Sequence, residues 1–454
     1  MDNIELKKFT TVNFLNFALG FLGLQFAWQM RIALSEPVTS SLGASPLLYS
    51  LIWLAGPFSG MVVQPIIGAL SDKTKSKFGR RRPYLLGGAI IASIALWLFP
   101  NSGNIVDGII LATGVKIPLW GGLLFAAIMI WIIDACINIA QGPYRALVPD
   151  VVPREQHAQA NSYISLAIGL GSVVAMVVAP TLKFLFNFQM SVPAQFIMAA
   201  LAFTLAMTWT CLTVTEKSTL DEVEESKDEH KSDVSFWQSL KEFFLLSPEV
   251  KKICTMQFFT WIGMMCLLIY ITPFVIHTVY GVPDVAVESV AQSLKDTAQN
   301  YALICLAVFN LVCFLVAIPI GKLADKFGNK KVHIISMLSM VVAYLCLAFF
   351  KSSPAAVLFF MALSGIGWAS VCALPFAMLS RYIKPGTEGS VMGIFNIFIA
   401  GPQVFVCTLV GWLINASVIN VAGSINHHYE YTFYIGAVCL LCASAITYFI
   451  KEGK

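Results

Sequence analysis

Long apolar runs alternate with short polar segments along the whole chain. There are twelve such runs, of roughly 17 to 29 residues each, and a helix of that length can cross a lipid bilayer. Their approximate bounds are 10–34, 46–70, 84–100, 118–146, 161–183, 194–214, 253–279, 300–321, 332–350, 355–379, 390–414 and 432–450. Because a helix satisfies its own backbone hydrogen bonds inside lipid, the pattern predicts an all-α membrane protein with twelve transmembrane helices.

A short basic signature occurs twice, each time directly after an apolar run. The first copy occupies residues 68–83 and the second occupies residues 321–331. A signature that recurs about half a chain later indicates two similar halves. We therefore predict two pseudo-symmetric six-helix bundles, at residues 1–214 and 253–454, joined by a cytoplasmic linker at 215–252.

Composition and charge support a membrane protein and exclude several other classes. The chain is 57% hydrophobic and only 12% charged, with a mean hydropathy of +0.76, which is more apolar surface than one water-soluble core can bury. The net charge of +4 is modest, so no nucleic-acid partner is expected. Of the 29 Lys and Arg residues, 23 fall on the side of the two termini, and this bias places both termini in the cytoplasm.

Cysteines and the linker add little chemistry. All eleven cysteines fall within apolar runs, where a free thiol behaves as a small hydrophobe, so neither disulfides nor a metal site is expected. The linker begins with an acidic stretch from Glu216 to Asp233, which predicts a solvated, poorly ordered segment. Its second part, residues 236–244, has an apolar stripe that predicts an amphipathic helix on the inner membrane surface.

Several motifs give the chain a family resemblance. Twelve spans, two halves and a loop signature after helices 2 and 8 resemble the major facilitator superfamily. Finer pieces resemble the plant sucrose transporters, their animal relatives and the wider glycoside-pentoside-hexuronide group. These pieces are Gly23–Trp28, Ile52–Pro57, Gln64-Pro65, Ser71–Pro83, Asp134 with Gln141–Leu147, and Gly393–Asn396 with Pro402-Gln403.

The first loop is the most specific of these pieces. Gly79 follows Asp72 by seven residues, where the common superfamily signature has three, as between Asp325 and Gly328. The resemblance covers nearly the whole chain and implies the major facilitator fold and sugar transport.

A polar stripe in the run 118–146 marks the candidate site. Asp134, Asn138, Gln141 and Arg145 follow one another at i, i+4, i+7 and i+11, which places them on one face of a helix. Exposing that face to lipid would cost several kcal/mol, so we expect it to face the bundle interior or a water-filled cavity.

Asp134 is the one carboxylate found inside the predicted spans. Burial disfavours a charged carboxylate, which suits a group that takes up and releases a proton in each transport cycle. The alternative is an aspartate permanently paired with a neighbouring helix. In the plant sucrose transporters that the chain resembles, the aspartate at the matching position is implicated in proton coupling and sugar binding.

Other polar and aromatic residues are weaker candidates for substrate binding. Arg145 could bind sugar hydroxyls, bound the cavity or pair with Asp150, although an Arg is favourable at any helix C-terminus. A sugar needs hydrogen-bond partners and an aromatic surface, and each further candidate has packing or an interhelical hydrogen bond as its alternative. These further candidates are Gln25, Trp28, Gln29, Trp53, Gln64, Tyr144, Trp368, Asn396 and Gln403.

The two loop signatures carry the candidate gate. Asp72 and Asp325 stand at the ends of helices 2 and 8, and Arg80 and Arg81 follow the first of them. In the superfamily that the chain resembles, such contacts stabilise one orientation of the two bundles, so we expect Asp72 to help hold the halves together. The alternative is that the cations only set topology.

These observations favour a proton-coupled sugar symporter that moves a disaccharide or glucoside, of the sucrose or maltose type, by alternating access. The predicted helix 46–70 has no carboxylate for sodium, so the proton is the expected coupling ion and no other cofactor is needed. A sodium-coupled or uncoupled carrier, a membrane sensor and an enzyme stay as alternatives. We expect a monomer in a bacterial inner membrane, because the linker and loops are short.

Overall fold

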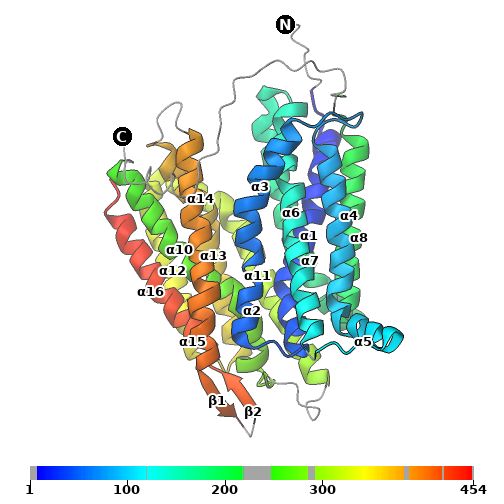
Figure 1. Cartoon of the computed structure of the whole chain (residues 1–454). Helices are drawn as coiled ribbons and strands as arrows, with labels where there is room; N and C mark the ends of the chain where they lie inside the picture. Colours follow the sequence, from blue (N-terminus) through cyan, green and yellow to red (C-terminus); the bar gives the residue numbers. More distant parts are fainter. Residues whose placement is uncertain are drawn as a thin grey trace. The chain divides into compact units, whose positions relative to one another are not determined.

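The computed structural model describes residues 8–118, 120–216, 218, 247–284, 292–382, 388–421 and 424–451, and helices dominate it (Figure 1). Within these residues, twelve helices are long and apolar enough to cross a membrane. The prediction of an all-α membrane protein with twelve spanning helices is therefore confirmed. The amphipathic helix expected at 236–244 lies outside the described residues.

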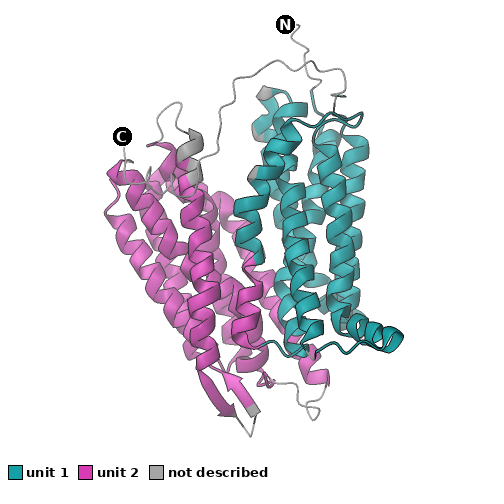
Figure 2. Ribbon diagram, in the orientation of Figure 1, with its two compact units in different colours: residues 1–44, 55–224 teal, residues 45–54, 225–454 magenta. Residues whose placement is uncertain are grey.

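The chain divides into two compact units (Figure 2). Unit 1 comprises residues 1–44 and 55–224, and unit 2 comprises residues 45–54 and 225–454. Unit 1 contains α1 (Thr11–Ser41), α3 (Ala55–Asp72), α4 (Arg82–Leu98), η1 (Phe99–Asn101), α5 (Ser102–Thr113), α6 (Gly121–Val151), η2 (Arg154–Gln156), α7 (His157–Phe186) and α8 (Val192–Thr213).

Unit 2 has the second set of helices and a small hairpin. Its elements are α2 (Pro46–Ile52), α10 (Pro248–Pro273), η3 (Phe274–Val279), α11 (Gln292–Phe327), α12 (Asn329–Phe349), α13 (Pro354–Ser380), α14 (Glu388–Phe405), η4 (Val406–Val410), α15 (Gly411–Ala416), β1 (Val418–Val421), β2 (Ser424–His427) and α16 (Tyr431–Tyr448). Strands β1 and β2 pair antiparallel, with Val418 opposite His427.

Serine caps begin several helices in both units. Ser45, Ser191, Ser247 and Ser353 each accept a hydrogen bond from a backbone N–H in the first turn of α2, α8, α10 and α13, and a proline stands at the first or second helical position of each. The serine satisfies an N–H that has no helical partner, and proline has the backbone angle that the first turn needs. These local signals fix where the helices begin.

Small residues let the helices pack closely within each unit. In unit 1, a Cβ on Gly23 of α1 would lie 2.5 Å from the carbonyl oxygen of Ala202 on α8. In unit 2, a Cβ on Gly365 of α13 would lie 2.5 Å from the carbonyl oxygen of Phe309 on α11. Neither position has room for a side chain, which is typical of helix packing in membranes.

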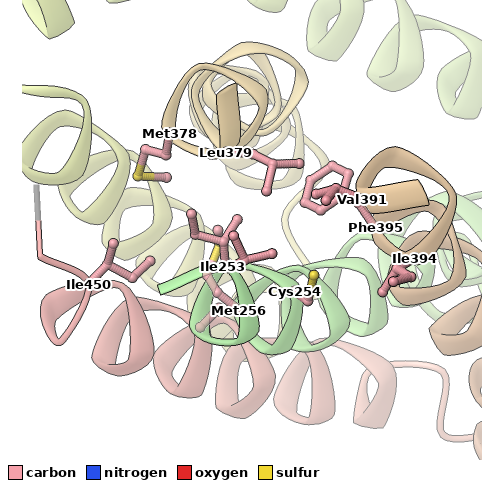
Figure 3. Close-up of a cluster of buried hydrophobic side chains, with 11 residues drawn as sticks. Ile253, Cys254, Met256, Met378, Leu379, Val391, Ile394, Phe395 and Ile450 are labelled. Atoms are coloured by element: carbon pink, nitrogen blue, oxygen red, sulfur yellow. The ribbon is translucent and has the colours of Figure 1, made fainter. Parts of the chain in front are cut away.

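Apolar side chains fill the interior of unit 2 and also cover the outside of the helices. Figure 3 shows a buried cluster in which Ile253 and Met256 of α10 lie near Leu379 of α13 and Phe395 of α14. Many large apolar side chains are exposed on the outside; the Ile318 side chain, for example, is on a residue that is 71% exposed. An apolar exterior is expected where the surrounding solvent is lipid.

Residues 45–54 depart from the predicted division at 214 and 253. The second apolar run breaks at Trp53, and the short helix before the break packs with unit 2. The Ser50 and Tyr270 hydroxyls lie 2.6 Å apart, and the Tyr49 hydroxyl donates to the Ile269 carbonyl at 3.0 Å. These buried hydrogen bonds explain why the segment groups with unit 2.

Three further features were not predicted. Helix α5 follows α4 where a loop was expected, and it ends at Gly114, whose φ of 69° is easy only for glycine. The hairpin formed by β1 and β2 occupies the loop before α16. Helix α1 continues to Ser41, so it also contains the buried Glu36, and the expectation that Asp134 is the one carboxylate inside a span is wrong.

Candidate functional site

An ion pair lies in the interior of unit 1. The Arg31 guanidinium on α1 donates from Nη2 to Oδ2 of Asp134 on α6 at 2.5 Å, and the two side chains are 2% and 0% exposed. A buried charge is costly when it is alone, so each residue compensates the other. The pairing of Asp134 with a neighbouring helix, which was the alternative interpretation, is thus seen in this structure, and its partner Arg31 was not recognised from the sequence.

The second oxygen of Asp134 is placed differently. Oδ1 is buried, and among the described residues it has no hydrogen-bond partner. A buried carboxylate oxygen without a donor is unfavourable, so this atom is suited to accept a proton or a hydroxyl hydrogen. Gly56 of α3 lies on the Oδ2 side, where a Cβ would be 3.5 Å from that oxygen, in ordinary van der Waals contact.

A chain of amide hydrogen bonds continues the site along α6. The Gln64 Nε2 on α3 donates to Oδ1 of Asn138 at 2.5 Å. The Asn138 amide nitrogen donates at 2.9 Å both to Ser59 Oγ on α3 and to the backbone carbonyl of Asp134. Two residues predicted separately are therefore in contact, and Ser59 joins them.

Helix α1 presents three more of the predicted residues. Gln29 is buried and donates to Ser172 Oγ on α7 at 3.3 Å. Gln25 is half-buried, and its Cβ lies 3.3 Å from the position that a Cβ on Gly171 would take. Trp28 is also half-buried. All three lie within two turns of Arg31, so the middle of α1, where the ion pair lies, is rich in polar groups.

The part of the polar stripe nearer the C-terminus of α6 is more exposed. Gln141 is half-buried and Arg145 is exposed, with its Cζ 5.9 Å from the centroid of the Phe21 ring. Tyr144 points elsewhere: it is fully buried, donates to the Phe17 carbonyl and stacks on Phe21 at 3.9 Å. This geometry gives Tyr144 a packing role, while its predicted role in substrate binding has no support from its contacts.

The remaining candidates lie in unit 2. Trp53 is 5% exposed and packs edge-on against Tyr49. Trp368 is half-buried, meets Trp261 edge-on at 5.8 Å and stacks on Phe309. Asn396 is exposed, and the Gln403 amide donates to a carbonyl of its own helix at 3.1 Å. Each of these residues stays a prediction, and Trp368 has the aromatic surroundings that suit a sugar ring.

The first loop signature forms an ion cluster inside unit 1. Arg81 pairs with Asp72 and, at 3.1 Å, with Asp150 at the end of α6, and Arg80 reaches Asp150 at 2.5 Å. The hydrogen bond from Arg80 to Asp150, together with nearby negative charges, raises the pKa of Arg80. The described partner of Asp72 belongs to its own unit, and the expectation that Asp72 helps to hold the two halves together stays a prediction.

Glu216 completes this cluster and was not recognised from the sequence. Its carboxylate accepts backbone N–H groups of Arg80, Arg81 and Arg82 at 2.9 to 3.2 Å, at the start of α4. A carboxylate at a helix N-terminus satisfies unpaired donors and the positive end of the helix dipole. Glu216 is therefore bound to unit 1, although it was predicted to be a solvated linker residue.

The second signature is built differently. Asp325 is exposed, and the described residues provide no ion-pair partner for it. Across the described part of the chain, no group of three or more His, Cys, Asp or Glu residues could hold a metal ion.

Comparisons with known proteins give the chain a family. A family model described as MFS/sugar transport protein matches residues 17–451. The general alpha-glucoside permease of Schizosaccharomyces pombe is 29% identical over 262 residues, which is 57% of this chain and 47% of the permease. Sucrose transport protein SUT2 of Oryza sativa subsp. indica is 27% identical over 422 residues, which is 85% of this chain and 83% of that protein.

Solved structures show the same fold. The D-xylose-proton symporter matches with a TM-score of 0.66 at 16% identity and covers 98% of this chain and 99% of its own. The nucleoside transporter NupG matches with a TM-score of 0.66 at 11% identity, over 98% of this chain and 100% of its own. Together with the family match, these similarities confirm the predicted major facilitator fold and a transporter rather than an enzyme. This protein belongs to the MFS/sugar transport protein family.

Proposed function

We propose that this protein is a proton-coupled symporter that moves a disaccharide or glucoside of the sucrose or maltose type by alternating access. The substrate class is supported by the relatives, which are named a glucoside permease and sucrose transport proteins. The coupling is supported by one observation above all: a fully buried carboxylate that has one oxygen paired with Arg31 and one oxygen without a described partner.

The pair provides a way to link proton uptake to sugar binding. When Asp134 is ionised, its charge and that of Arg31 cancel. A proton that binds to Oδ1 neutralises the carboxylate and weakens its attraction for the guanidinium 2.5 Å away. The N–H groups of Arg31 are then available to sugar hydroxyls, and loss of the proton restores the pair and favours release of the sugar.

Amide groups of the neighbouring helices would orient the sugar. Asn138 and Gln64 form a hydrogen-bonded pair at 2.5 Å between α6 and α3, one turn along α6 from Asp134. Amides both donate and accept, so they match sugar hydroxyls in either role. In this proposal Gln25, Trp28 and Gln29 of α1 extend the same surface.

Sodium coupling is the second candidate, and the pair argues against it. A sodium ion needs several oxygen ligands, whereas Oδ2 of Asp134 is already bound to the Arg31 guanidinium. The proton adds to a single atom and needs no coordination shell. The pair therefore favours a proton over sodium.

Transport by purified protein in liposomes tests the proposal. We expect Asp134→Asn to lose uphill sugar accumulation driven by a pH gradient while retaining sugar exchange, because the amide cannot release a proton. The matched control is Asp107→Asn, which removes an exposed carboxylate on α5 and leaves accumulation intact. Full accumulation by Asp134→Asn would refute proton coupling through this residue, and accumulation driven by a sodium gradient at equal pH would establish the alternative.

The proposed location is a cellular membrane, with both termini in the cytoplasm as the distribution of Lys and Arg indicates. The relatives named above come from plants and a fungus, so the bacterial inner membrane stays a prediction. The monomeric state also stays a prediction. Labelling of a single cysteine placed at Lys77 in intact cells and in inverted vesicles would test the orientation.

A further inference from the structure

A cluster of titratable side chains lies at the end of unit 2 that contains the β1–β2 hairpin, which Figure 1 shows. It combines His277 of η3, Asp284 of the loop after η3, His427 of β2 and Tyr429 in the segment before α16. We call these four residues the hairpin cluster. His427 and Tyr429 lie more than a hundred positions after His277 and Asp284 in the sequence, so the fold brings the two pairs together.

The Asp284 carboxylate is the centre of the hairpin cluster. Its Oδ2 lies 2.5 Å from Nδ1 of His427, and its Oδ1 lies 3.1 Å from Nδ1 of His277. The Tyr429 hydroxyl donates to Oδ1 at 3.0 Å. One carboxylate thus binds His277 of η3 together with His427 and Tyr429 at the end of the hairpin.

The backbone of the loop is tied to the hairpin as well. The Asp284 N–H donates to Oδ1 of Asn426 at 3.1 Å, and the Asn426 amide donates to the His277 carbonyl at 3.4 Å. The His277 ring stacks on Tyr429 with a centroid distance of 5.6 Å. The hairpin is therefore fastened to η3 and its loop through the same few residues.

The geometry fixes where a proton can be added. Nδ1 of His277 faces two acceptors, the Val282 carbonyl at 2.7 Å and the Asp284 carboxylate, so this nitrogen carries hydrogen. Nδ1 of His427 faces the same carboxylate and also donates. A further proton therefore binds at Nε2 of either ring, and the resulting imidazolium lies directly against the carboxylate.

Burial makes this charge interaction strong. The side chains of His277, Asp284 and His427 are 4%, 7% and 9% exposed. Water screens a pair of this kind far less than it screens a surface pair. Adding one positive charge beside Asp284 therefore changes how firmly the hairpin is held.

Other charged groups surround the hairpin cluster and contribute to the electrostatic field around it. Glu430 accepts from Lys351 at 2.5 Å and from Nδ1 of His428 at 2.9 Å, which forms a second carboxylate centre one step along the chain. Helix α11 packs against η3, and its first turns contain Lys295 and Asp296. The Tyr280 ring, directly after η3, and the Tyr301 ring of α11 lie against each other near this end, and Cys305 of α11 is close to both hydroxyls.

We infer that the hairpin cluster is a proton-binding latch, in which protonation of His277 or His427 beside Asp284 fastens the β1–β2 hairpin to the end of η3. This site is separate from Asp134 and does not depend on which solute is carried. With both termini in the cytoplasm, the latch faces the outside of the cell, where the protons that drive a symporter are most abundant.

The direction of the pH effect follows from the charges. An imidazolium stabilises the latched arrangement, and histidine ordinarily gains its proton at about pH 6 to 7. The extra stability is therefore fully present below that range and is lost as the pH rises above it. The latch is tightest in acid and loosens towards neutral and alkaline pH.

Hydrogen exchange of the purified full-length protein in lipid nanodiscs tests the latch. Amide protection of residues 418–430 is measured at about pH 5.5 and about pH 8, which bracket histidine titration, and exchange times are scaled for the intrinsic rate at each pH. We expect protection to be about tenfold greater in acid. Asp284→Asn keeps the size of the side chain, and we expect it to abolish this difference.

Two further variants keep the test decisive. His427→Gln keeps a donor but cannot gain charge, so it lowers the acid protection even if Asp284→Asn does not fold. His428→Gln is the matched control, since its ring faces Glu430 and not Asp284, and the pH difference persists in it. Equal protection at both pH values in the unaltered protein, or a pH difference that survives in Asp284→Asn or disappears in His428→Gln, would overturn the inference.

Discussion

The two units have similar helices and a common loop signature, yet they place their charges differently. Unit 1 holds an ion pair, Arg31 with Asp134, in the interior of its helices and a cluster around Arg81 at one end. Unit 2 has the His333 side chain in its interior, where Ser370 Oγ lies 2.8 Å from Nδ1, while pairs such as Lys351 with Glu430 lie in loops. A repeat in the sequence therefore preserves the helical framework and not the chemistry inside it.

The largest difference is expected when the interior of each unit is perturbed. Arg31→Met leaves the Asp134 carboxylate buried without its counter-charge, and we expect a loss of about 3–5 kcal/mol in stability. His333→Leu in unit 2 removes the contacts of the imidazole with Ser370 and Met256 and leaves no charge unpaired, so we expect it to cost about 1 kcal/mol. Thermal unfolding in detergent measures both.

A double variant separates charge from packing in this prediction. Arg31→Met with Asp134→Asn removes both charges, so most of the lost stability returns. If Arg31→Met proved no more destabilising than His333→Leu, the interior of unit 1 would not differ from that of unit 2 in the way described.

The next largest effect concerns the cations of the two loop signatures. Arg81 is buried and contacts Asp72, Asp150 and Ser71, so we expect Arg81→Gln to cost about 2 kcal/mol. The matched change in unit 2 is Lys330→Gln, since Lys330 is half-buried and donates to the Ile450 carbonyl at 3.0 Å. We expect it to cost about 0.5 kcal/mol. Comparable losses in thermal unfolding would show that the two signatures are equivalent.

A smaller difference between the units is expected in how stability depends on pH. Burial alone would raise the pKa of Glu430, but hydrogen bonds from Lys351 and His428 and the charge of Lys351 lower it on balance. A lowered pKa gives stability that is present above the ordinary carboxyl value, at about pH 4.3, and is lost as the pH falls through the folded value. We expect Glu430→Gln to flatten the acid limb of the stability profile, while Asp107→Asn leaves it unchanged.

Most of the fold could be predicted from the sequence. A membrane requires long apolar helices, and the Lys and Arg residues of the loops indicate which loops face the cytoplasm. The break at Trp53 could not be predicted, since the run 46–70 is apolar on both sides of it and only the contacts of Ser50 with Tyr270 reveal where the first part packs. Helix α5 was missed because Gly103, Asp107 and Gly108 interrupt the apolar pattern.

The candidate site was predicted only in part. Helical spacing correctly placed Asp134 and Asn138 on one face of α6, since periodicity fixes directions within a helix. It does not say which helix faces that stripe, so Arg31 was not joined to Asp134. Glu216 was missed for a related reason: an acidic stretch indicates a solvated segment unless a helix N-terminus happens to lie beside it.

The smallest effect is expected from the two signature aspartates, and it tests whether the loops act through their position or through their partners. The Asp72 side chain is 58% exposed, and Arg81 still has Asp150 when Asp72 is lost. Water and salt screen such a pair, so we expect Asp72→Asn to cost no more than about 1 kcal/mol and to slow sugar exchange about twofold. Asp325 has no described ion pair, so Asp325→Asn is expected to change stability by less than about 0.5 kcal/mol. Exchange rates in proteoliposomes at low and high salt measure both variants. A larger effect of Asp325→Asn than of Asp72→Asn would mean that the second signature acts through contacts made in another state of the transport cycle.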